Sequence, residues 1–388
     1  MKRWNWQQSD WPKFTWDAKR LAKAEQEFLV RGGVLLGTMG HLDEPDSGAL
    51  LIEAITTEAL TTSEIEGELL DRDSVQSSIR RQLGLATDPL RAKPAEQGIA
   101  ELMVLLYRTP MEPLSHAMLF GWHRMITKGR TDLKDVGRYR THPEPMQVVS
   151  GKIHDPTVHF EAPPSAAVPE EMEQFVAWFN RTSPEGEAPL PAMTRAGLAQ
   201  LYFVCIHPFE DGNGRIARAL AEKALAQGLG RPTLTALAAT ILDRRREYYG
   251  ELEQANKRNE VSRWLAWFAG VTLEAQFRTQ AHAEFILEKT KLLDQLKGQL
   301  NPRQEKALLR MLREGSKGFE GGMTAGKYVV ITGTTSATAS RDLADLAKKG
   351  ALVRSGQKKG AKYGLPIASR RHPRIVITAG GEVHMATD

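Results

Sequence analysis

The sequence predicts a mainly α-helical protein that carries one β-hairpin and ends in a small α+β domain. Apolar residues recur at three- and four-residue intervals through most of residues 18–300, as in helices that bury one face. Runs rich in β-branched and aromatic residues stand out at residues 146–161 and 351–365. The hydrophobic fraction of 41% and the charged fraction of 26% are typical of soluble globular proteins, and no apolar run reaches membrane-spanning length.

Length and charge together predict several domains. At 388 residues the chain exceeds what one ordinary hydrophobic core organises. Residues 301–388 hold 16 Lys and Arg against 7 Asp and Glu, so this region carries +9 and the first 300 residues carry −4. The single cysteine, Cys205, cannot form an internal disulfide and indicates a reducing, cytoplasmic environment. We expect an N-terminal helical region (1–95), a helical core (96–270), a connecting helix (271–300) and a basic C-terminal domain (301–388).

The N-terminal region begins with four tryptophans and continues as helices. The tryptophans all lie within residues 1–16, and so many aromatic rings predict a packed cap rather than a frayed tail. Asp17 can cap a helix that Gly32 and Gly33 are expected to end. Residues 47–83 are predicted to form two helices that meet near residues 61–67.

The core is predicted to combine helices with one hairpin. Two β-prone runs flank the turn at His154, Asp155 and Pro156, which predicts antiparallel strands. The first strand would carry Val148, Val149, Ser150 and Gly151, and the second would carry His159 and Phe160. Helices are expected at 98–108 and 115–127, from Pro169 onward, and at 192–206, 244–268 and 271–296.

The chain is organised around residues 207–218, HPFEDGNGRIAR, which combine the parts of a phosphate site. The loop Gly212-Asn213-Gly214 can point successive backbone N–H groups at one anion. A strong helix-forming stretch follows, so the loop would lie at a positive helix N-terminus. Arg215 and Arg218 lie three residues apart on that helix and therefore share one face.

Two residues of the same stretch supply further chemistry. Asp211 offers an oxygen ligand for Mg²⁺, and His207 is a base that is neutral near pH 7. A base, a metal ligand, an anion-binding loop and two arginines are what phosphoryl-type transfer needs.

Residues 207–218 resemble the signature of Fic-domain proteins, His-x-Phe-x-(Asp/Glu)-Gly-Asn-Gly-Arg-x-x-Arg, with every fixed position filled. The resemblance implies a Fic-type helical bundle that moves AMP from ATP to a Ser, Thr or Tyr hydroxyl of a target protein, or of the chain itself. His207 would be the base and Asp211 would hold Mg²⁺. The ATP phosphates would be bound by Gly212, Asn213, Gly214, Arg215 and Arg218.

The same resemblance gives a role to residues 62–67. On spacing alone, Glu66 is a solvated helix residue. Thr62, Glu66 and Gly67 nevertheless fit the inhibitory pattern (Ser/Thr)-x-x-x-Glu-(Gly/Asn) of many Fic proteins. There the glutamate pairs with the second signature arginine, here Arg218, and would displace the γ-phosphate of ATP. Autoinhibition by Glu66 is therefore expected.

Two further regions match the family. Tyr249 and Asn256 have the seven-residue spacing of a Tyr and an Asn that line the adenosine pocket in Fic proteins. The hairpin corresponds to the flap, which aligns a target segment by strand-like pairing. Fic proteins of this layout often form dimers, which leaves a homodimer open.

Residues 301–388 resemble a winged helix-turn-helix domain. The order is helix (303–314), helix or strand (327–332), helix (336–349) and two β-prone runs that flank a loop with Lys358 and Lys359. Binding of DNA and binding of another protein both remain open for this domain.

Three alternatives to adenylyl transfer remain. A Fic scaffold that uses Glu66 to position a water would remove AMP instead, as a second or main activity. Transfer of another phosphate-containing group is disfavoured, because the signature loop is unaltered. The third alternative belongs to a different functional class: the chain would be a DNA-binding regulator whose Fic domain senses nucleotide.

Overall fold

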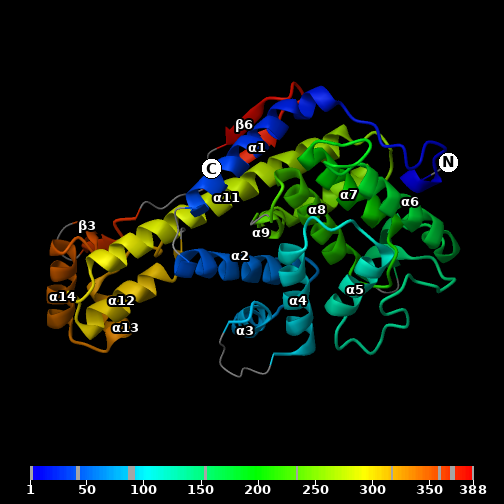
Figure 1. Cartoon of the computed structure of the whole chain (residues 1–388). Helices are drawn as coiled ribbons and strands as arrows, with labels where there is room; N and C mark the ends of the chain where they lie inside the picture. Colours follow the sequence, from blue (N-terminus) through cyan, green and yellow to red (C-terminus); the bar gives the residue numbers. More distant parts are fainter. Residues whose placement is uncertain are drawn as a thin grey trace. The chain divides into compact units, whose positions relative to one another are not determined.

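The computed structural model describes residues 3–40, 44–85, 92–152, 155–232, 235–315, 318–356, 360–367 and 372–386. These residues are mainly helical, as predicted (Figure 1). They include three short two-stranded sheets. The chain divides into two compact units. The first comprises Met1–Val34, Leu51–Gln276 and Pro373–Asp388, and the second comprises Leu35–Leu50 and Phe277–His372. Among the described helices, none combines the length and apolar character needed to span a bilayer.

The N-terminal segment packs as predicted and leads into helices. Trp4 is 3% exposed, and its ring meets the edge of Phe160 at 5.4 Å between centroids. The expected end of the first helix at Gly32 and Gly33 is wrong, because it continues to Gly40. Gly32 serves close packing instead, since a Cβ there would lie 2.7 Å from Leu229 Cδ2. The elements are η1 (Asn5–Gln7), α1 (Ala18–Gly40), α2 (Glu44–Ile65), α3 (Arg72–Gln82), α4 (Pro94–Arg108) and α5 (His116–Ile126).

The predicted hairpin is present. Strands β1 (Gln147–Lys152) and β2 (Asp155–Glu161) pair antiparallel. Val148 pairs with Phe160 but Val149 pairs with Val158, so His159 is an extra residue that forms a β-bulge. The predicted turn residue His154 lies outside the described residues.

The centre of the first unit is built from α7 (Ala192–Ile206) and α8 (Asn213–Leu229). Nearly every residue of α7 is buried, including Cys205, which is a core residue as predicted. The short connection between α7 and α8 carries His207 and the glycine loop. Neighbouring elements are η2 (Ser165–Ala167), α6 (Val168–Arg181), α9 (Leu237–Asp243) and α10 (Arg245–Ala255).

One continuous helix, α11 (Ser262–Gln295), runs through the break predicted between residues 268 and 271. The actual break lies earlier, between Asn256, which caps α10, and Ser262. Gly270 lies within α11, where a Cβ would come within 2.8 Å of Ile375 O. The predicted connecting helix at 271–300 is thus the second part of α11.

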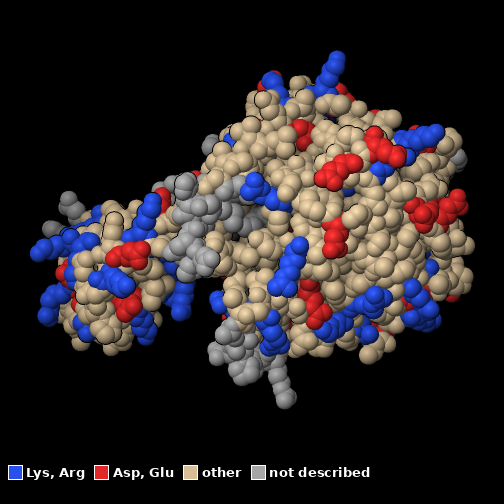
Figure 2. All heavy atoms as spheres, viewed as in Figure 1, with Lys and Arg blue, Asp and Glu red and all other residues tan. Residues whose placement is uncertain are grey.

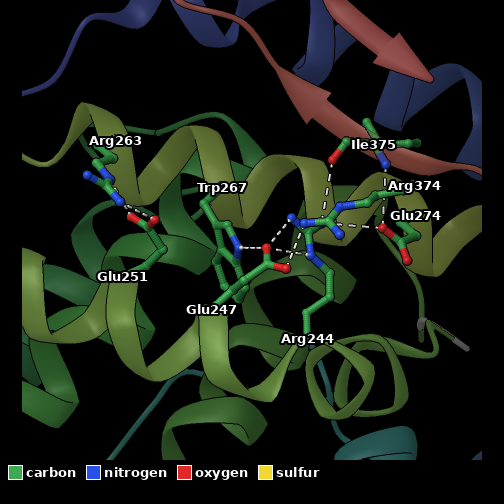
Figure 3. Close-up of polar contacts among 8 residues, drawn as sticks. All are labelled: Arg244, Glu247, Glu251, Arg263, Trp267, Glu274, Arg374 and Ile375. Atoms are coloured by element: carbon green, nitrogen blue, oxygen red, sulfur yellow. Dashed lines mark hydrogen bonds and ion pairs between the residues drawn. The ribbon is translucent and has the colours of Figure 1, made fainter. Parts of the chain in front are cut away.

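The C-terminal segment differs from the predicted boundary of 301–388. Its hairpin of β5 (Arg374–Ile377) and β6 (Val383–Ala386) belongs to the first unit. Arg374 Nη2 lies 2.6 Å from Glu247 Oε1, and Arg244 bonds to both Glu247 and Glu274 (Figure 3). Ile375 is fully buried. The run of β-branched residues Ile375-Val376-Ile377 was the signal that the sequence prediction missed.

The second unit contains α12 (Pro302–Leu312), α13 (Ala325–Thr332), α14 (Ser336–Lys348), β3 (Val353–Ser355) and β4 (Lys362–Gly364). Its elements follow the predicted order around a core that includes Leu308, Tyr328, Leu343 and Leu346. Figure 2 shows Lys and Arg side chains spread over the face of this unit that is in view. The predicted wing lysines Lys358 and Lys359 lie outside the described residues.

Candidate active site

His207 caps α7, and its ring has one protonated nitrogen and one that can accept a proton. Its backbone is left-handed, with φ 52° and ψ 58°, a conformation that costs a non-glycine residue about 1–2 kcal/mol. Nδ1 lies 3.1 Å from Val204 O, and because a carbonyl only accepts, Nδ1 carries the proton. Nε2 is then left as the acceptor. Burial lowers the pKa of His207 to about 4, so the ring is neutral near pH 7.

The glycine loop has the shape of an anion cradle. Gly212 has φ 79°, and a Cβ there would collide with Ile126 Cδ1. Asn213 accepts a hydrogen bond from Phe209 N at 3.0 Å and donates one to Phe209 O at 2.8 Å. Both polar atoms of the Asn213 side chain are thus engaged within the protein. This geometry favours a role in shaping the loop over the predicted side-chain contact with phosphate.

Asp211 lies at the rim of the cradle with its side chain 38% exposed. One carboxylate oxygen accepts from Gly212 N at 2.6 Å, and the other forms an ion pair with Arg130. The described residues contain no cluster of three or more groups able to hold a metal. A single accessible carboxylate fits Mg²⁺ that is bound mainly through substrate phosphates and waters.

Arg218 is held by the end of α2. Its side chain is 3% exposed, and Nη1 lies 2.7 Å from Glu66 Oε1. Nε donates to Thr62 Oγ1 at 2.8 Å, and Nη2 donates to Thr62 O at 2.7 Å. Burial acts to lower the pKa of Arg218, but the Glu66 carboxylate raises it overall. The structure therefore brings together Thr62, Glu66 and Arg218, as the resemblance to Fic proteins implies.

Glu66 also occupies the cradle itself. A Cβ built on Gly214 would collide with Glu66 Oε1, so the carboxylate lies directly against the first turn of α8. That position, at a helix N-terminus beside a buried arginine, is one that a phosphate would favour. Gly67 follows with φ 86° and ends the α2 region.

The sequence prediction missed two ion pairs at this site. Glu68 Oε2 lies 2.6 Å from Arg215 Nη1, and the Arg215 side chain is 7% exposed. Arg130 pairs with Asp211, as described above. Asp211, Arg215 and Arg218 thus each form an ion pair within the protein. The only sequence signal for Glu68 is a second carboxylate two residues after Glu66, and Arg130 carries no local signal.

The predicted adenosine-pocket residues lie on one side of α10. Tyr249 is 39% exposed and donates to Ile65 O at 3.2 Å, next to Glu66. Asn256 is 7% exposed, and its Nδ2 lies 3.4 Å from His159 O. Its buried Oδ1 has no hydrogen-bond partner among the described residues. An orphaned amide oxygen is what a base donor group of a nucleotide would satisfy.

The flap is tied to α10 by side chains. His159 Nδ1 lies 3.0 Å from Glu253 Oε2, and its Nε2 lies 2.6 Å from Ser150 Oγ. Phe160 is buried against Trp4, whereas Val148 and Val149 are 36% and 51% exposed. The hairpin is anchored along β2 and leaves β1, including Gly151, exposed.

Comparisons with known proteins identify the family of the region that holds this site. A model of the Fic/DOC family matches residues 113–225, a span that contains His207, Arg218 and the flap. The chain therefore contains a Fic domain. A second model, a domain of unknown function (DUF4172), matches residues 4–85, which include the tryptophan segment and Glu66.

Similar proteins cover only parts of the chain. Protein adenylyltransferase fic-1 of Caenorhabditis elegans is 30% identical over 134 residues, which is 34% of this chain and 22% of that protein. The Caenorhabditis briggsae protein of the same name is 31% identical over the same shares. The chain therefore matches about a fifth of these relatives' length. A Fic family protein from Desulfovibrio desulfuricans G20 has 18% identity, a TM-score of 0.49, and coverage of 90% of this chain and 97% of that one.

Proposed function

We propose that the Fic domain transfers AMP from ATP to a hydroxyl group of a protein. The observation that carries the proposal is the neutral His207, which stands in the short connection that leads into an anion cradle with two buried arginines. Nε2 would take the proton from the attacking hydroxyl. Backbone N–H groups of the cradle would stabilise charge on the α-phosphoryl oxygens. Arg215 and Arg218 would hold the remaining phosphates, so that pyrophosphate leaves in line.

The substrate side of this proposal uses the remaining site residues. Asp211 would hold Mg²⁺, which would neutralise charge on the α- and β-phosphates when bound with ATP. Tyr249 and the orphaned amide oxygen of Asn256 would contact the adenosine. The exposed strand β1 would align the target segment by strand pairing.

The resting protein would be inhibited, because Glu66 holds the arginine and the space that the nucleotide needs. Removing the carboxylate should raise the transfer rate by at least about tenfold, which corresponds to about 1.4 kcal/mol. A protein in which Glu66 positions a water for AMP removal would behave differently. It would lose that activity when the carboxylate is removed.

The test compares wild type, Glu66→Gly and His207→Ala, each incubated with ATP labelled on the α-phosphate and Mg²⁺ in a cell lysate. We expect weak, strong and absent labelling of protein, respectively. Equal labelling by wild type and Glu66→Gly would overturn the inhibitory role, and label surviving in His207→Ala would overturn the role of the base. A labelled target that wild type, but not Glu66→Gly, strips of label would favour hydrolytic removal of AMP.

We also propose a second candidate function, DNA binding by residues 301–367. Helices α13 and α14 are joined by three residues, Gly333 to Thr335, as in a helix-turn-helix. Ser336, Ser340 and Arg341 are exposed on α14, where a recognition helix would contact bases.

Titration of the whole protein into duplex DNA at rising salt tests this second function. Binding that weakens steeply with salt, and weakens further in Arg341→Ala, would support it. A protein that does not bind DNA at low salt would instead leave this unit as a protein-binding module.

A further inference from the structure

Arg140 is a buried cation that the proposed chemistry leaves without a role. It is 1% exposed, and it forms no ion pair with any described residue. Burial lowers its pKa to about 10. A buried charge without a carboxylate partner is costly, and every acceptor of its guanidinium is instead neutral. We therefore expect the buried charge of Arg140 to serve a specific purpose in the protein.

The guanidinium binds the turn that carries the base. Nε donates to His207 O at 2.8 Å, and the Arg140 backbone N donates to Pro208 O at 2.9 Å. Nη2 also lies 3.5 Å from Ile206 O. These three carbonyls are consecutive, and the middle one belongs to the left-handed residue His207. Strained backbone of this kind persists only where its surroundings hold it.

The same guanidinium binds the segment that follows the flap. Nη2 donates to Pro163 O at 2.5 Å, and Nη1 donates to Ser165 Oγ at 2.8 Å. Pro163 lies two residues after β2 ends, and Ser165 in turn donates to His142 O at 2.5 Å. The planar guanidinium, with donors on several sides, therefore connects the root of the flap, residues 163–165, to the turn that carries His207.

We propose that Arg140 is a positioning residue that fixes the position of His207 relative to the root of the flap. It touches neither nucleotide nor target in this role. It fixes where Nε2 lies relative to a hydroxyl that the flap presents. Because misplacement by about 1 Å can cost on the order of 100-fold in rate, its loss should lower kcat and leave ATP binding intact. This inference rests on the proposed AMP transfer.

The test measures kcat and KM for ATP in the Glu66→Gly background, with Arg140→Lys and Arg140→Gln added separately. Arg195→Lys is the matched control, because Arg195 is equally buried and donates to Phe179 O, away from the site. We expect kcat to fall at least about tenfold in both Arg140 variants, while KM for ATP changes less than about twofold. Arg195→Lys should lower thermal stability and leave kcat within about twofold. Guanidinium ion, added well below denaturing concentrations, should restore part of kcat to Arg140→Ala in a saturable way.

Some results would overturn the assignment. They are a kcat of Arg140→Lys within about twofold of its parent, or a loss of kcat as large in Arg195→Lys. A rise in KM for ATP at unchanged kcat would place Arg140 in nucleotide binding instead. If Glu66→Gly alone transfers no AMP, the proposed function fails and this inference falls with it, which is distinct from an Arg140 variant that remains active.

Discussion

Because Glu68 pairs with Arg215, we predict that the proposed inhibition by Glu66 has a second component, which Glu68→Gln would remove. The 2.6 Å contact joins an arginine side chain that is 7% exposed to a carboxylate that is 36% exposed. Solvent reaches the carboxylate, so the pair should contribute about 0.5–1 kcal/mol, as partly exposed ion pairs do. A nucleotide that must displace Glu68 would then bind about two- to fivefold more tightly after the substitution.

Calorimetric titration with ATP and Mg²⁺ measures this change directly. The His207→Ala background prevents turnover during the measurement. Glu68→Gln keeps the size of the side chain, and Glu64→Gln is a matched control, because Glu64 is an exposed carboxylate of the same region. We expect Glu68→Gln to add to the effect of Glu66→Gln in the double variant, because the two carboxylates hold different arginines. An affinity for ATP that Glu68→Gln leaves unchanged would refute this reasoning.

Three further predictions follow from the same contacts. Thr62→Val should lower the free energy of unfolding by about 1–3 kcal/mol, because Arg218 Nε would lose its buried acceptor, whereas Thr61→Val should change it far less in the same melts. Arg130→Gln should lower the Mg²⁺ concentration for half-maximal activity by up to about fivefold, since the arginine competes for Asp211, and an unchanged Mg²⁺ dependence would contradict this. Burial lowers the pKa of His123 to about 4. Below about pH 6.5, His123 therefore binds a proton in the unfolded chain but not in the folded one, so the free energy of unfolding falls from pH 7 toward pH 4. If Tm falls with pH in His123→Phe as much as in wild type, His123 is not the cause.

Local signals predicted the reactive centre. Residues 192–218 contain a helix, a glycine loop and a second helix whose boundaries follow from periodicity and from φ-permissive residues, and the structure has them there. The hairpin at 147–161 was also predicted by β-prone runs around a turn. The pairing of Glu66 with Arg218 was predicted from family resemblance and not from spacing.

Long-range packing produced the differences from the prediction. Gly32 was expected to end a helix, yet the helix continues to Gly40, and the missing side chain leaves room for Leu229. Gly270 stays inside α11 because the backbone of Ile375 approaches it. Arg130 and Arg140 act on residues more than 60 positions away in sequence, so no local pattern marks them. Tertiary contacts of this kind override local preference.

The most direct test of AMP transfer compares two positions of label in ATP. Glu66→Gly protein is incubated with Mg²⁺ and either α-labelled or γ-labelled ATP, and the label bound to protein is counted after denaturing separation. We predict label on protein from the α position alone, with the γ label released in pyrophosphate. Protein that carries γ label, or that carries neither label, would contradict the account.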